Sequence, residues 1–131
     1  MKAIKIFTSL CLMLAIAGFV KAQSTADMVK EWERAKAYTK EYLDAMPEAG
    51  YSLKPTPEMR SFADQMLHLT DANYGIGAAA TGEKSPVGFG DSEKATDKSK
   101  ANVTKMVMDG YDFVINAIKK MTAAQLTEKV K

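Results

Sequence analysis

The sequence predicts an all-α protein with three long helices and a long crossover between the second and the third. Three stretches repeat apolar residues at steps of three and four, which is the spacing of one helix face. No stretch shows the apolar–polar alternation of a half-buried strand. Residues 83–98 are polar and turn-rich, and at ~3.3 Å per extended residue they can run back along a bundle of ~30 Å. We therefore expect the second and third helices to lie parallel.

Residues 1–22 predict a secretory signal peptide. Two lysines precede an uncharged, mainly apolar run over 6–20, and Ala22 follows at the position that a signal peptidase inspects. The run is shorter than the ~20 residues needed to cross a bilayer. We expect cleavage before Gln23, export to the periplasm or the medium, and no membrane attachment afterwards. Residues 23–131 then form one helical domain.

The composition excludes several classes of function. Without the three lysines of the predicted leader, the chain carries 15 basic and 16 acidic residues, and the two signs are interspersed. Such a surface has no basic patch for a nucleic acid backbone, so we expect no nucleic acid partner. The single cysteine, Cys11, lies in the leader, so residues 23–131 hold no disulfide or thiolate nucleophile.

The first helix is expected over about 24–46. Ser24 or Thr25 can cap its start, and Pro47 and Gly50 end it. Its predicted apolar stripe consists of Met28, Trp32, Ala35, Tyr42 and Met46. A stiff connector with two prolines follows over 48–57.

The second helix begins after Thr56 or Ser61 as its cap and fades through a glycine-rich stretch to Gly82. The predicted buried stripe consists of Phe62, Met66, Leu69, Ala72 and Ile76, widened by Leu67. The third helix starts near Asp97 or Ser99. Its stripe consists of Val103, Val107, Gly110, Val114, Ala117 or Ile118, and Met121. A short turn from Thr122 through Leu126 follows.

Four segments carry a resemblance to a known family: residues 32–36, 60–73, 84–90 and 108–115. They resemble DinB-like proteins, most closely the small exported members, and the likeness covers nearly all of 24–131. The resemblance implies a four-helix bundle with a long crossover between its second and third helices. This chain ends where the fourth helix is expected to begin. We therefore expect an incomplete bundle, truncated before helix four, or one whose groove is filled by a partner helix or a second copy.

His68 is the candidate metal ligand. The resemblance implies a divalent metal, such as Zn or Ni, held by three histidines, and His68 matches the one on the second helix. The chain has no other histidine, so the site is incomplete within it. Asp64 and Asp71 share one side of the helix with His68 and are candidates to orient its imidazole. The alternative is a partly exposed histidine beside two solvated acids.

Two functions follow. The first is an exported DinB-like protein descended from metal-dependent enzymes of the thiol transferase or hydrolase type, inactive as this chain and with no catalytic residue assigned. The alternative is a non-catalytic helical protein whose apolar groove accepts a partner helix.

Overall fold

A computed structural model describes residues 24–128 of the chain. The predicted signal peptide, residues 1–22, lies outside these residues. Within 24–128 the protein is all-helical, with three long α-helices, two short 3-10 helices and no strand. None of these helices is both long and apolar enough to cross a membrane.

The three long helices are α2 (Thr25–Ala45), α3 (Phe62–Thr81) and α4 (Lys100–Lys120). Each begins after a serine whose side chain accepts a backbone N–H of the first turn: Ser24, Ser61 and Ser99. These are three of the caps that the sequence predicts. α3 does not fade at its internal glycines, but continues to Gly82, whose φ of 77° ends it.

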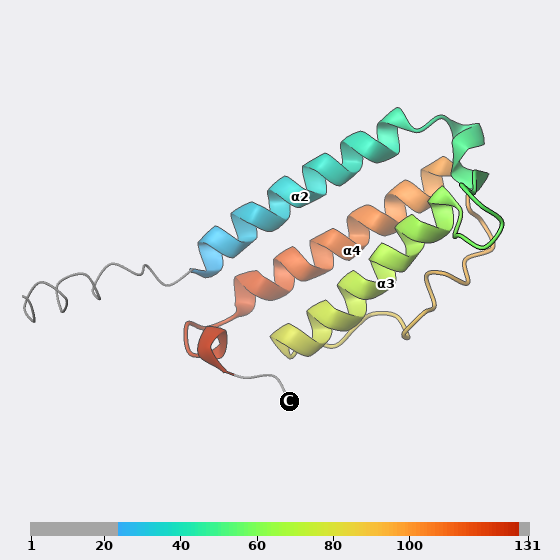
Figure 1. Cartoon of the computed structure of the whole chain (residues 1–131). Helices are drawn as coiled ribbons and strands as arrows, with labels where there is room; N and C mark the ends of the chain where they lie inside the picture. Colours follow the sequence, from blue (N-terminus) through green and yellow to red (C-terminus); the bar gives the residue numbers. More distant parts are fainter. Residues whose placement is uncertain (1–23, 129–131) are drawn as a thin grey trace, which may run out of the picture.

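Helix α4 lies between α2 and α3 and packs against both (Figure 1). Its first residue, Lys100, contacts the end of α2, where its ammonium donates to the carbonyl oxygens of Asp44 and Met46. At its other end Lys120 pairs with Glu83, just beyond α3. α3 and α4 therefore run parallel, with α2 antiparallel to both, which confirms the predicted crossover.

One buried cluster lies toward the end of the bundle where η2 (Glu48–Ser52) joins α2 to α3, and buried residues continue along α4 to Ile118. Tyr51 of η2 is buried there, donates its hydroxyl to the carbonyl of Leu43 and meets Phe62 edge to face. The buried cluster consists of Leu43, Tyr51, Ala63, Leu67, Val103, Val107 and Tyr111. At the opposite end, η3 (Gln125–Thr127) follows α4.

Two predicted core positions are wrong. Tyr42 is 71% exposed, and its neighbour Leu43 is fully buried in its place. Ile76 is 68% exposed, because α3 packs against α4 through a different face of mostly small or polar residues. That face comprises Ala63, Leu67, Thr70, Tyr74, Gly77 and Thr81. The apolar stripe predicted for α3 is therefore only partly covered.

Candidate functional site

The crossover lies along one face of α3, the face that carries His68. Four residues of that face, Asp64, His68, Asp71 and Gly75, follow one another at steps of three and four. Each meets the returning chain: Lys98 pairs with Asp64, Glu93 contacts His68, and the ring of Phe89 lies beside Gly75. The carboxylate of Asp71 accepts the backbone N–H groups of Ser92 and Glu93.

The imidazole of His68 is held by Glu93. Its Nδ1 lies 2.5 Å from Oε1 of Glu93, whose other carboxylate oxygen accepts Nε of Arg60 at 3.2 Å. The hydrogen bond to His68, together with Arg60, lowers the pKa of Glu93. The histidine side chain remains 43% exposed, and its Nε2 bonds to none of residues 24–128. Glu93 thus fixes the imidazole at one nitrogen and leaves the other open, an arrangement that metal-ligating histidines share with ordinary histidine–carboxylate pairs.

The two acids expected to orient His68 have other partners. Asp64 closes the capping box of α3 with Ser61 and pairs with Lys98, and these bonds lower its pKa to about 2. Asp71 is buried and holds the backbone of the crossover. The residue that contacts His68 is instead Glu93, which sequence reasoning missed. Helix periodicity gives no signal for it, because it reaches α3 from the irregular crossover.

These residues do not make a metal centre by themselves. Nowhere in the described part of the chain do three His, Cys, Asp or Glu side chains come together in a way that could hold an ion. His68 and Glu93 supply one imidazole and one carboxylate, whereas a structural or catalytic zinc uses three or four protein ligands. A metal at His68 therefore stays a prediction that needs ligands from elsewhere.

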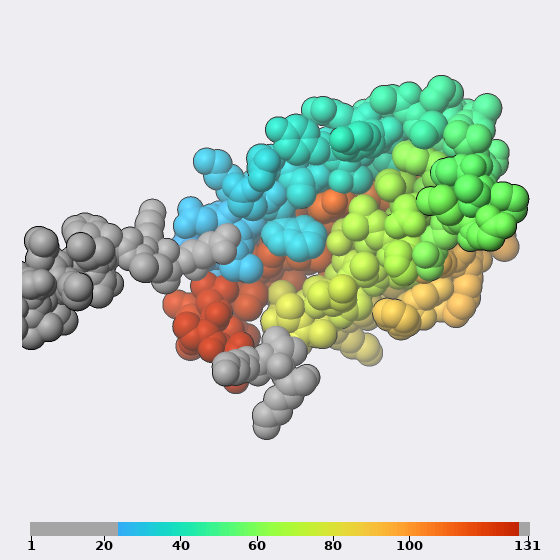
Figure 2. Space-filling view, viewed as in Figure 1, coloured from blue at the N-terminus to red at the C-terminus, as the bar shows by residue number. Residues whose placement is uncertain are grey.

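A cavity of about 840 Å³ opens at the other end of the bundle, between the start of α2 and the end of α3. Figure 2 shows the molecule hollowed there, between the blue, yellow and red parts of the surface. α4 forms its floor with Val114 and Ile118, and the segment 121–128 lines one end. The wall residues are Ser24, Thr25, Met28 and Trp32 of α2 and its cap, and Ala72, Asn73, Ile76, Gly77, Ala80 and Thr81 of α3.

The cavity explains the exposed apolar stripe of α3. Ala72 and Ile76, two of its five members, line the cavity wall, so this part of the stripe faces an open space, whereas Phe62, Met66 and Leu69 pack against the buried cluster. On the opposite wall Trp32 is part-exposed and touches Tyr111 edge to face, with ring centroids 5.8 Å apart. The position left open is the one that a fourth helix would fill in a square bundle.

The fold and the two sites together define a helical bundle protein with a long crossover and an open fourth position. The chain belongs to the DinB superfamily, whose family model matches residues 31–131. This assignment confirms the resemblance seen in the sequence. No curated protein and no solved structure matches the chain.

Proposed function

We propose that this DinB-superfamily chain is an exported binding protein, and that the cavity between α2, α3 and α4 holds an apolar partner. The observation that carries the proposal is the face of α3 around Ile76: apolar side chains that a complete bundle would bury line a hollow instead. Exposed apolar side chains that line a concave site are typical of ligand-binding and partner-binding sites. Export is supported by the leader pattern of residues 1–22.

A matched pair of variants tests the binding function. Ile76 and Tyr42 are exposed to similar extents, 68% and 71%, but only Ile76 lines the cavity. We expect Ile76→Glu to abolish the fluorescence gain of the neutral dye Nile red, and Tyr42→Glu to leave it near the wild-type value. Equal dye binding by both variants and the wild type would refute the proposal.

Export is tested by expressing the chain in a Gram-negative host and measuring the mass of the periplasmic product. A mature N-terminus at Gln23 is the expected result. A full-length product retained in the cytoplasm would contradict it.

A second candidate, favoured by the contact between His68 and Glu93, is a metal-dependent enzyme of the thiol transferase or hydrolase type. In it, Glu93 fixes the imidazole and leaves Nε2 of His68 open to a divalent ion such as Zn²⁺ or Ni²⁺, which would supply Lewis acidity. The remaining ligands would come from outside residues 24–128.

Calorimetric titration of Zn²⁺ and Ni²⁺ tests this candidate. His68→Ala should abolish binding, and Glu93→Gln should weaken it by about 10- to 100-fold, the usual effect of losing an orienting carboxylate. Lys94→Gln, a neighbouring exposed position paired with Asp91, serves as the control. Weak and equal heats of binding in the wild type and all three variants would refute this candidate function.

A further inference from the structure

The chain joins the described fold at the wall of the cavity. Ser24, the cap of α2, is one of the lining residues. Its backbone is extended, with φ of −86° and ψ of 159°, and its side chain and that of Asp27 close a capping box. An N-cap residue with extended backbone marks a break in the helical path of the chain. The helix therefore starts at Ser24, beside the open position of the bundle.

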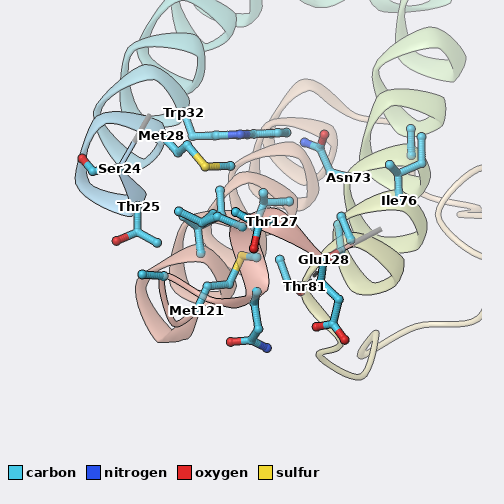
Figure 3. Close-up of a pocket in the computed structure, with 18 residues that line it drawn as sticks. Ser24, Thr25, Met28, Trp32, Asn73, Ile76, Thr81, Met121, Thr127 and Glu128 are labelled. Atoms are coloured by element: carbon cyan, nitrogen blue, oxygen red, sulfur yellow. Dashed lines mark hydrogen bonds between the residues drawn. The ribbon is translucent and has the colours of Figure 1, made fainter. Parts of the chain in front are cut away.

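This open position suits a segment that is joined to α2 by a short loop. The cavity lies between α2 and α3, and Figure 3 shows Met28 and Trp32 of α2 across from Ile76 of α3. Only residues 21–23 separate the apolar run over 6–20 from Ser24. Antiparallel neighbouring helices are joined by loops of about 2–5 residues. A run that turns back after such a loop lies beside α2, where a fourth helix completes a bundle.

The length of the run matches the cavity. From Ser24 to Trp32 the lining of α2 covers about 12 Å, at ~1.5 Å per helical residue. About eight helical residues have the same length, so the second half of the run, residues 13–20, is long enough to fill the cavity. These residues are all apolar or glycine, as are most of the side chains that they would meet.

The charges also match. Among the lining residues the one ionisable side chain is the carboxylate of Glu128, which lies in the segment that lines one end of the cavity. The residue directly after the apolar run is Lys21, whose charge is opposite. An uncharged segment in the cavity followed by a cation at its rim therefore leaves no charge buried without a partner.

We infer that residues 13–20 of the leader fill the cavity in an unprocessed chain that has folded, and that processing opens it. The opening step is hydrolysis of the peptide bond between Ala22 and Gln23 by a signal peptidase, with water as the co-reactant. This inference rests on the proposed binding function and names a regulation of that site. The leader suits the cavity better than a second copy does, because a short tether gives an effective concentration in the millimolar range. A second copy would instead lose its translational and rotational freedom on binding.

The test uses the full chain, made by cell-free synthesis without membranes so that the leader stays attached. Trp32 is the single tryptophan and lines the cavity, so acrylamide quenching of its emission reports the filling of the cavity without any dye. Trp32 should be shielded in the wild type. The double variant Leu14→Glu with Ile16→Glu, which places two charges in the docking segment, should be quenched more strongly. The matched control is Ile4→Glu with Ile6→Glu, the same change outside residues 13–20, which should be quenched like the wild type.

Nile red gives a second measurement on the same proteins. If the leader fills about nine cavities in ten, the apparent Kd of the dye rises about tenfold. We therefore expect the wild-type full chain to bind the dye about tenfold more weakly than the double variant Leu14→Glu with Ile16→Glu. The processed protein from the periplasm should bind it like that double variant, and the comparison of Ile76→Glu with Tyr42→Glu accordingly applies to the processed protein.

The two measurements separate this inference from the binding function. Equal quenching of Trp32 in the wild type and in Leu14→Glu with Ile16→Glu overturns the role of the leader, whatever the dye does. Loss of shielding in the control variant overturns it as well, because the contact is then not specific to residues 13–20. Shielding that disappears on dilution, with a dimer seen by light scattering, overturns it in favour of a second copy. Shielding in the wild type alone and in the control, without dye binding by any of the proteins, supports the role of the leader and refutes the binding function.

Discussion

Two glycines of α3, Gly75 and Gly77, allow the packing between α3 and α4 to be tested with one kind of substitution. An added Cβ at Gly77 would lie 2.8 Å from a methyl carbon of Val114. Val114 is buried and β-branched, so it has little freedom to move away. An added Cβ at Gly75 would lie 3.2 Å from Phe89, but that ring is 86% exposed and can swing aside. The two sites therefore differ mainly in the neighbour that must yield.

The expected stabilities follow from two opposing effects. Replacing glycine by alanine inside a helix stabilises it by about 1 kcal/mol. At Gly75 we expect most of that gain. At Gly77 overpacking against Val114 costs about 1–3 kcal/mol, so the net effect is a loss of up to about 2 kcal/mol. The two variants should differ by about 1–3 kcal/mol in their free energy of unfolding.

Urea denaturation followed by circular dichroism at 222 nm measures this difference. With an m value of about 1–3 kcal/mol/M, the unfolding midpoints should lie roughly 1 M apart, with Gly75→Ala the more stable protein. If Gly77→Ala is as stable as Gly75→Ala, then α3 and α4 do not pack as closely as the structure has them.

Three further predictions concern single contacts. The pKa of Asp64 is lowered to about 2 by Lys98 and Ser61; its stabilising effect should be fully present above about pH 4 and lost as the pH falls toward 2. Asp64→Asn should remove on the order of 1 kcal/mol at pH 7 and little at pH 2, as read from urea midpoints at both pH values. Tyr51→Phe removes the hydroxyl that donates to the carbonyl of Leu43 and should cost about 1 kcal/mol in the same assay, whereas an unchanged midpoint would mean that water replaces the bond. Lys100→Met removes the ammonium that binds two carbonyls at the end of α2; amide hydrogen exchange should then rise in the last turn of α2 and stay unchanged in α3.

Helix positions and their order were predictable, because the signals are local. Each serine cap lies within three residues of the N–H that it accepts, and the left-handed Gly82 ends α3 by a rule that needs no partner. The parallel course of α3 and α4 followed from the length of the crossover.

The face of α3 that packs on α4 was not predictable from hydropathy. That face uses small and polar residues such as Thr70 and Gly77, which allow close approach but do not register as an apolar stripe. The sequence pattern did mark the apolar residues around Ile76, but they line an open cavity. Hydropathy periodicity marks an apolar face of a helix and does not tell whether that face meets another helix or a cavity. The contact of His68 with Glu93 joins a helix to an irregular segment and has no local signature.

The contacts between the crossover and α3 have a consequence for how the chain folds. Two parallel helices cannot be joined by a tight turn, so contacts between α3 and α4 form only after a long loop has closed. The chain therefore loses the conformational entropy of that loop before Thr70 contacts Gly110. The carboxylate of Asp71 accepts the backbone N–H groups of Ser92 and Glu93, and these hydrogen bonds divide that loop into two shorter ones. A chain without the Asp71 carboxylate is therefore expected to reach its native state more slowly, with the search for α4 as the slow event.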